Sequence, residues 1–234
     1  MKIQTYGDSA LIIKFEDEIS LEISRKVISL YQNLEKTQQF QFIIPAYNSI
    51  TVGLDKRKTS FKEATSLIEE TATQALPDSQ VTKHLMIPVC YEQEYAVDLP
   101  EVEKCTGLSA DEIIELHCSQ SYHVYMLGFI AGFPYLGALP KALETPRRAE
   151  PRLKVPAGAV GLAGRQTGIY PTQAPGGWQL IGQTPVSLFD PKSDTPSTLM
   201  PGDRVRFRAI SQDEFKLIKI KVETSIYEPE FFNG

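Results

Sequence analysis

Arginine side chains next to prolines are the first residues in this chain that could do chemistry. Arg147, Arg148 and Arg152 lie around Pro146 and Pro151, on backbone that the proline rings make stiff. A guanidinium held in this way can bind a carboxylate or a phosphate through two parallel hydrogen bonds. A solvated basic loop is the alternative, and the arginines alone do not distinguish the two.

A second candidate segment places polar side chains between glycines. Residues 164–170 read Gly-Arg-Gln-Thr-Gly-Ile-Tyr, and residues 175–178 read Pro-Gly-Gly-Trp. Such a segment can line a pocket for a small polar ligand, although a hairpin connection would have a similar composition. The indole of residue 178 either lies on a pocket wall or fills the core of a barrel. The candidate ligand contacts here are Gln166, Thr167, Tyr170, Gly176, Gly177 and Trp178.

Both candidates belong to one glycine-rich, basic stretch, residues 128–182. It holds ten of the fifteen glycines and carries six Lys/Arg against two Asp/Glu. No Asp or Glu occurs between Glu150 and Asp190, whereas residues 91–127 have eight acidic side chains and one basic side chain. A long acid-free stretch with several cations is typical of an anion-binding surface. A turn-rich segment that happens to lack acids is the alternative.

A histidine is a further candidate for chemistry. Ser109 and Glu112 form the S-x-x-E pattern of a capping box, which predicts a helix whose last turn holds His117. His117 shares a stripe with Ile113, so its ring faces the protein, either as a buried hydrogen-bonded residue or as a site residue. The side chain of Cys118 points about 100 degrees away from that of His117, so the two are not expected to act as nucleophile and base.

The usual motifs for nucleotides and metals do not occur in the sequence. No G-x-x-x-x-G-K-[ST] phosphate loop is present, so any ATP would be bound in another way or by a partner. Gly158, Gly161 and Gly164 are spaced as G-x-x-G-x-x-G, but among predicted strands, so a dinucleotide site is not expected. The three cysteines include no C-x-x-C pair, and we expect reduced thiols and no metal site.

Composition narrows the class of protein. The chain has 234 residues, with 42% hydrophobic and 23% charged residues, which is ordinary for a globular protein. A net charge of −5 argues against general nucleic-acid binding. No apolar run approaches the roughly 20 residues that cross a bilayer, and the N-terminus has no signal pattern. We therefore expect a cytoplasmic protein that binds neither nucleic acid nor membrane.

Hydrophobic periodicity predicts an α+β domain over residues 1–90. Apolar runs predict strands at 9–15, 40–46, 49–54 and 84–89, and helical spacing predicts one helix from residue 19 and another from residue 60 to about 76–78. The resulting order, β-α-β-β-α-β, is that of a ferredoxin-like domain. We expect this domain to serve as a scaffold or docking module.

Short strands separated by Pro/Gly turns predict a β-barrel over residues 91–220. Strands are expected at 122–127, 186–189 and 204–208, and the last of these alternates apolar residues with arginines. Ser211 and Glu214 form another capping-box pattern and predict a short helix. Residues 221–234 are expected to be a loosely held C-terminal tail.

Several long motifs, in order, carry a family resemblance. Residues 128–140, 147–160 and 164–185, together with Leu-Phe-Asp-Pro at 188–191 and Pro-Gly-Asp-Arg-Val-Arg-Phe at 201–207, resemble the family that contains the B subunit of bacterial 5-oxoprolinase. The same family includes the sporulation-kinase inhibitor KipI and subunit 1 of allophanate hydrolase. The resemblance covers nearly the whole chain, and it implies a small α+β domain followed by a cyclophilin-like, mostly antiparallel barrel.

The resemblance also implies an activity, partners and site residues. The implied activity is ATP-dependent hydrolysis of 5-oxo-L-proline to L-glutamate together with 5-oxoprolinase subunits A and C, with ATP and Mg at or across the interface with the latter. The implied alternatives are inhibition of a histidine kinase and a part in allophanate or urea metabolism. By position, His117 and Tyr122 match catalytic candidates. The matched candidates for binding substrate or phosphate are Arg147, Arg152, Gln166, Thr167, Tyr170, Gly176, Gly177 and Trp178.

Overall fold

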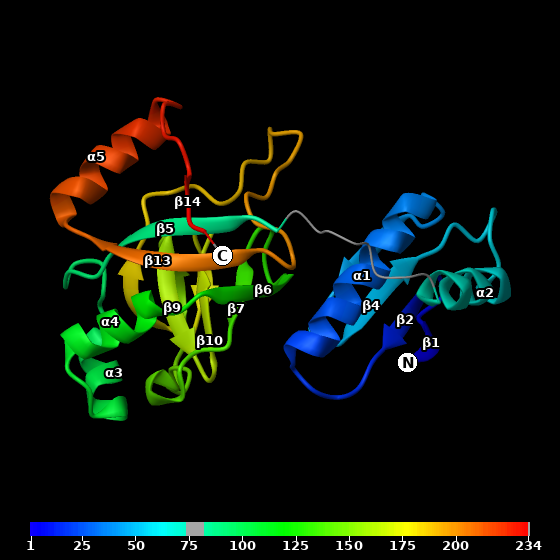
Figure 1. The fold of residues 1–234 in the computed structure, drawn as a ribbon, viewed down its shortest axis with the longest axis horizontal. Helices are drawn as coiled ribbons and strands as arrows, with labels where there is room; N and C mark the ends of the chain where they lie inside the picture. Colours follow the sequence, from blue (N-terminus) through cyan, green and yellow to red (C-terminus); the bar gives the residue numbers. More distant parts are fainter. Residues whose placement is uncertain (74–81, 234) are drawn as a thin grey trace. The chain divides into compact units, whose positions relative to one another are not determined.

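The computed structural model describes residues 1–73 and 82–233, which belong to two compact units that divide between residues 81 and 82 (Figure 1). Each unit has its own hydrophobic core. The helix end expected at residues 76–78 lies outside the described residues. In the part of the chain that the structure describes, no helix is both long enough and apolar enough to span a membrane.

The first unit is a four-stranded antiparallel sheet with two helices. The strands are β1 (Lys2–Tyr6), β2 (Ala10–Lys14), β3 (Phe42–Pro45) and β4 (Ser49–Gly53), in the order β1-β2-β4-β3. The helices are α1 (Leu21–Thr37) and α2 (Phe61–Ala72). Ser60 and Glu63 form the predicted capping box at the start of α2. The buried face of α1 packs on the sheet through apolar residues that include Val27 and Leu34.

The order of elements in the first unit is β-β-α-β-β-α, so the predicted β-α-β-β-α-β order and the boundary at residue 90 are wrong. The strand predicted at 84–89 is β5 (His84–Cys90), but all of its pairing partners belong to the second unit. Strand β1 was missed because its residues are mostly exposed and give no apolar alternation. An apolar run such as that of β5 predicts a buried strand without saying which sheet it joins.

The second unit is the predicted β-barrel. Its strands are β5, β6 (Tyr122–Leu127), β7 (Pro134–Gly137), β9 (Ala159–Ala163), β10 (Gln166–Ile169), β12 (Gln179–Gln183) and β13 (Arg204–Ile210). They pair in the order β12-β9-β10-β7-β6-β13-β5, and pairing of Gln183 with Cys90 joins β12 to β5 and closes the barrel. All these pairs are antiparallel except β13 with β5. Two short strands outside the barrel, β8 (Arg152–Val155) and β11 (Ala174–Gly176), pair with each other.

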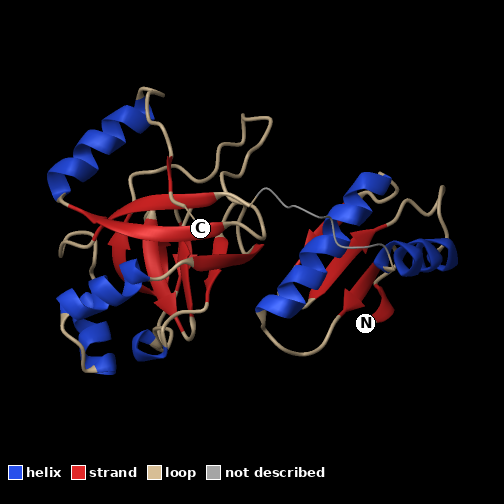
Figure 2. Ribbon diagram, in the orientation of Figure 1, coloured by secondary structure: helices blue, strands red, loops and turns tan. Residues whose placement is uncertain are grey.

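Helices lie outside the barrel strands of this unit (Figure 2). They are α3 (Leu99–Thr106), α4 (Ala110–Ser119), α5 (Gln212–Glu223) and a short 3-10 turn at Lys141–Leu143. The capping box of Ser109 and Glu112 is confirmed. Ser211 caps α5, but its box is not completed, because the carboxylate of Glu214 binds Arg208 instead.

Two further predictions for the second unit are corrected. Residues 186–189 form no strand, and only an isolated bridge joins Phe189 to Ser197. The C-terminal residues are not a loose tail, because β14 (Glu230–Phe231) pairs with β5. Glu230 also binds Arg208, and the ring of Phe232 stacks on that of His84. The sequence offered too short an apolar run there to predict a strand.

Candidate functional site

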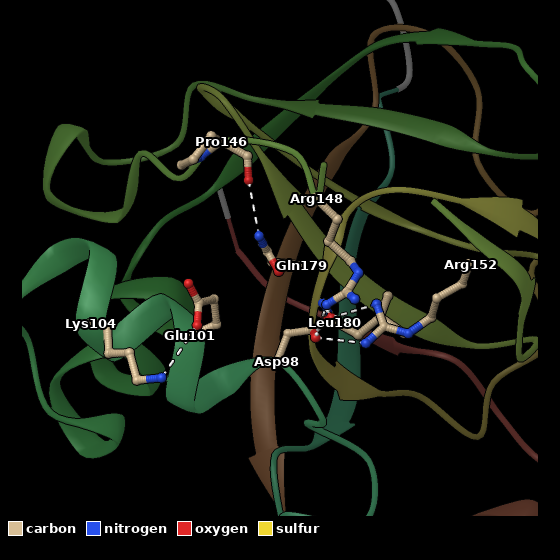
Figure 3. A network of polar contacts seen from close by, with 8 residues as sticks. All are labelled: Asp98, Glu101, Lys104, Pro146, Arg148, Arg152, Gln179 and Leu180. Atoms are coloured by element: carbon tan, nitrogen blue, oxygen red, sulfur yellow. Dashed lines mark hydrogen bonds and ion pairs between the residues drawn. The ribbon is translucent and has the colours of Figure 1, made fainter. Parts of the chain in front are cut away.

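A buried carboxylate that holds two arginines is the centre of the candidate site (Figure 3). Asp98 has a side chain only 4% exposed, and Arg152 donates to both of its oxygens, at 2.6 and 2.8 Å. Arg148 donates one further hydrogen bond to Asp98, at 2.9 Å. The backbone N–H of Leu180 donates to the second oxygen, at 2.8 Å. Four donors therefore satisfy one buried carboxylate, as burial of a charge requires.

The backbone around Asp98 explains its position. Asp98 is the N-cap residue of α3, yet its side chain makes no capping hydrogen bond and is left for the arginines. Its own N–H donates to the carbonyl of Leu180, so the start of α3 is attached to strand β12 through both backbone and side chain. Arg152 opens strand β8. The carboxylate thus joins a helix start and two strands that lie far apart in the sequence.

A polar pocket of about 610 Å³ opens beside this centre. Its wall carries three carboxylates, those of Asp98, Glu101 and Glu150, and three cations. Two of the cations are paired, since Arg148 binds Asp98 and Lys104 lies 3.5 Å from Glu101. The third cation is on Arg147, which makes no ion pair with any described residue. The remaining lining residues are Val97, Pro100, Pro146, Ala149 and Gln179.

Two polar atoms at this pocket are buried and have no hydrogen-bond partner within the described chain. They are Nε of Arg148, a donor, and Oε1 of Gln179, an acceptor. Gln179 is 4% exposed, and its amide nitrogen is fixed by donating to the carbonyl of Pro146, at 3.1 Å. The bond fixes the amide so that Oε1 points away from Pro146, toward Arg148 and α3 (Figure 3). Unsatisfied buried polar groups cost free energy, which a ligand can recover.

An aromatic cluster adjoins the pocket through Arg147 and Trp178. The guanidinium of Arg147 lies 6.0 Å from the centre of the indole, within the range of a cation–π contact. The indole meets the rings of Phe133 and Tyr135 edge to face, and Phe133 meets Tyr170 in the same way. Burial raises the pKa of Tyr170, so this hydroxyl stays protonated. The cluster gives the site a rigid apolar wall.

Glycine at position 176 is required by the close approach of this wall. A Cβ added to Gly176 would overlap the hydroxyl of Tyr170. The carbonyl of the next residue, Gly177, accepts from the N–H of Arg148 at 2.8 Å. The predicted Pro-Gly-Gly-Trp segment therefore positions the arginine loop as well as the indole.

His117 lies in the barrel core, with no exposed surface. Its Nδ1 is 2.7 Å from the hydroxyl of Tyr91, and its Nε2 is 2.9 Å from the hydroxyl of Thr167. Thr167 gives its own proton to the carbonyl of Gly161, so it accepts from Nε2. His117 is therefore the neutral tautomer that carries its proton on Nε2, and Tyr91 donates to Nδ1. Burial lowers the pKa of His117 to about 3, which keeps the ring neutral.

Tyr122 belongs to the same core network. Its hydroxyl donates to the carbonyl of His117 at 2.9 Å, and its ring lies against His117 and Phe207. Burial raises the pKa of Tyr122 and also that of Tyr91. Both atoms of the imidazole that could move a proton are occupied by protein groups. The geometry assigns His117 and Tyr122 to the packing of the core rather than to a surface where a ligand could bind.

The predicted site residues thus separate into two groups. The structure brings five of them to the pocket and its aromatic wall, namely Arg147, Tyr170, Gly176, Gly177 and Trp178. It adds Arg152 through Asp98, but both terminal nitrogens of this guanidinium are already used there. Thr167 lies with His117 and Tyr122 in the core. Gln166 begins β10, opposite Ala163, and does not line this pocket.

Sequence reasoning missed Asp98 and Gln179, and it did not single out Arg148 above its neighbours. Asp98 stands before Leu99-Pro100, where an Asp followed by Pro predicts the start of a helix and so an ordinary cap. One available signal was the charge pattern, because Asp98 belongs to the acidic segment that precedes the basic stretch. Gln179 gave no signal of its own beyond following Trp178.

The chemistry that this site can do is recognition of a small polar ligand. Its wall offers cations, carboxylates and an amide oxygen, and no nucleophile touches the pocket. Within the described ranges, no group of three or more His, Cys, Asp or Glu could hold a metal ion. The pocket balances three carboxylates against three cations, so it lacks the excess positive charge that a triphosphate would need. A nucleotide does not fit this pocket.

Comparison with known proteins gives a consistent result. The family model described as carboxyltransferase domain, subdomain C and D, matches residues 1–199. The chain is 40% identical over 231 residues to the 5-oxoprolinase B subunit of Bacillus subtilis, covering 93% of this chain and 96% of that protein. It is 43% identical to the 5-oxoprolinase B subunit of Escherichia coli O157:H7, covering 86% and 92%. The corresponding protein of Haemophilus influenzae is 40% identical, covering 88% and 97%.

Solved structures resemble the chain as well. The structure of TTHA0988 is 38% identical with a TM-score of 0.78, and the match covers 86% of this chain and 40% of that longer chain. A conserved uncharacterized protein of Pyrococcus horikoshii is 42% identical with a TM-score of 0.56, covering 92% of this chain and 100% of that one. Urea amidolyase of K. lactis has a TM-score of 0.79 at 17% identity, covering 99% and 16%, and this likeness concerns the fold alone.

Proposed function

The chain belongs to the family of 5-oxoprolinase B subunits, and from this premise we propose that it works as the B subunit of an ATP-dependent complex that hydrolyses 5-oxo-L-proline to L-glutamate. The observation that carries the proposal is 40–43% identity to three curated members of the family over 86–93% of this chain. The proposed partners are subunits A and C of the same enzyme. We also propose that the barrel is of the cyclophilin-like kind.

The chemistry explains why such a reaction needs ATP and several subunits. An unstrained five-membered lactam resists hydrolysis, so its carbonyl must be activated before water can break the C–N bond. ATP would supply that activation by phosphorylating the amide oxygen. In the products, the carbonyl carbon keeps the oxygen from water as a carboxylate and the nitrogen becomes an amine.

The described residues of this chain support a binding role better than a role in proton transfer. The pocket beside Asp98 holds polar groups of both charges, whereas His117 and Tyr122 are enclosed in the core. We propose that ATP and Mg are held at or across the interface with the C subunit, outside this pocket. On its own, the chain would then bind ligand but have little or no activity.

Reconstitution tests the proposal directly. Subunits A and C are purified and assayed for ATP-dependent release of glutamate from 5-oxoproline, with and without this chain. We expect activity to require all three. Full activity of A and C alone would refute the role proposed here.

Kinship with urea-metabolising enzymes provides a weaker alternative. The chain is 24% identical to urea amidolyase of Saccharomyces cerevisiae, over 95% of this chain but 14% of that protein. The shared region is a small part of a much larger enzyme. The same reconstituted complex, assayed with urea or allophanate in place of 5-oxoproline, is expected to give no turnover.

A further inference from the structure

The pocket between α3 and residues 146–150 has a donor and an acceptor that are both unused. Nε of Arg148 can donate, and Oε1 of Gln179 can accept, yet each is buried without a partner among the described residues. Arg147, on the same wall, is a cation without a carboxylate in the described part of the chain. A ligand that satisfies all three must offer an anionic oxygen and an N–H group close together.

Resting on the proposed function, we propose that this pocket binds 5-oxo-L-proline by its α-carboxylate and its ring N–H. In this ligand the ring nitrogen and the carboxylate are attached to the same carbon, so donor and anion are neighbours. The carboxylate would accept from Arg148 and lie near Arg147, while the ring N–H would donate to Gln179. The lactam carbonyl, on the far side of the ring nitrogen, would then face away from the arginines.

The charges of the wall agree with a ligand of this kind. Glu150 has no ion pair with any described residue, and Glu101 is only loosely paired with Lys104, so a multiply charged anion would be repelled. A single carboxylate balanced by one free guanidinium fits this environment. The aromatic wall behind Arg147 offers an apolar surface for the ring.

Access to the two buried atoms requires a small movement of one side chain. The Arg148 side chain is 33% exposed and holds Asp98 through a single nitrogen, whereas Arg152 holds it through two. Arg148 can therefore turn toward a ligand while Arg152 keeps Asp98 paired. This division of work explains why one carboxylate is given two arginines.

The only tryptophan of the chain provides a binding assay that does not depend on activity. Trp178 directly precedes Gln179 and faces Arg147, so its fluorescence should change when the pocket fills. The full chain is titrated with 5-oxo-L-proline, with N-methyl-5-oxoproline, which lacks the N–H, and with 2-pyrrolidinone, which lacks the carboxylate. We expect saturable binding of the first and at least tenfold weaker binding of the other two.

Two variants and a matched control locate the effect. Gln179→Met removes the acceptor and should abolish the preference for 5-oxo-L-proline over its N-methyl analogue. Arg147→Gln should abolish the preference over 2-pyrrolidinone. Gln183→Met is the control, because Gln183 lies on the same strand and also donates to a backbone carbonyl, but outside the pocket. It should retain both preferences.

The outcomes separate this inference from the proposed function. In the reconstituted complex, the two pocket variants should raise KM for 5-oxoproline tenfold or more with little change in kcat. An active complex whose KM and ligand preferences are the same in the wild type and in Gln179→Met overturns the inference alone. A chain that binds with the expected preferences, but that subunits A and C do not need for activity, overturns the proposed function alone. No saturable binding by the wild-type chain also overturns the inference.

Discussion

Thr167 accepts a hydrogen bond from Nε2 of His117 at 2.9 Å, across the core of the barrel. The hydroxyl then passes its own proton to the carbonyl of Gly161. Because Tyr91 satisfies the other ring nitrogen, every polar atom of the imidazole is bonded inside an apolar core. The network makes the orientation of α4 against the barrel specific.

Removing the acceptor of this bond should destabilise the protein. In Thr167→Val the shape is kept but the N–H of His117 is left unsatisfied, so we expect a loss of about 1–3 kcal/mol in the free energy of unfolding. Thr167→Ser keeps the hydroxyl and should lose less. Urea denaturation of both variants checks this, and equal stability of the valine variant and the wild type would contradict the network.

The buried imidazole should make stability depend on pH. Its pKa is lowered to about 3 in the folded chain, below the ordinary value of 6.5, so the unfolded chain takes up a proton first as the pH falls. The stability contributed by neutral His117 is therefore complete above pH 6.5 and lost as the pH falls toward 3. The slope from this group is at most about 1.4 kcal/mol for each pH unit.

His117→Asn isolates this contribution. The variant should be less stable at about pH 7, but its free energy of unfolding should fall less steeply than that of the wild type between about pH 6.5 and pH 5. Urea denaturation at several pH values measures both slopes. Identical slopes would show that His117 does not titrate as its burial requires.

The carboxylate of Asp98 should be worth more than that of an exposed pair. Asp98→Asn leaves two guanidinium groups without their anion, and we expect a loss of about 3 kcal/mol or more. Asp55→Asn is a matched control, because Asp55 also binds both nitrogens of an arginine, but Arg57 is 87% exposed. That change should be nearly neutral, as is usual for exposed ion pairs. Similar losses in the two variants, measured by urea denaturation, would argue against the central role of Asp98.

The contact between Gly176 and Tyr170 can be tested with a compensating pair. Gly176→Ala places a methyl group on the Tyr170 hydroxyl and should cost about 1–3 kcal/mol. Tyr170→Phe removes that hydroxyl, so the double variant should recover most of the loss. A double-mutant cycle of thermal unfolding measures the coupling. Additive losses would show that alanine is harmful for another reason.

Local signals in the sequence predicted local structure well. The capping boxes at Ser60 and Ser109 depend on residues three positions apart, and both formed. Asp98 carried the same kind of signal and predicted a cap, but its carboxylate binds an arginine 54 residues away. No pattern around Asp98 encodes that partner, because the contact exists only once the barrel has closed.

The same limit explains the domain boundary and the place of the histidine. The run at 84–89 predicted a strand correctly, but its pairing with β13 depends on residues more than a hundred positions later. For His117, helical spacing indicated a ring facing inward and left both a buried and a functional role open. Burial decided between them, and burial is a property of the complete fold.

Strand β5 lies in the barrel between β13 and β12, and β14 extends its outer edge. On a ribosome, β5 is the first strand of the second unit to emerge, whereas β13 and β14 emerge near the end of synthesis. The nascent chain must therefore hold an apolar, unpaired strand for most of the time in which the second unit is made. The first unit needs none of these residues and can complete its sheet earlier. Premature termination before residue 204 would thus yield a folded first unit attached to an open, aggregation-prone sheet.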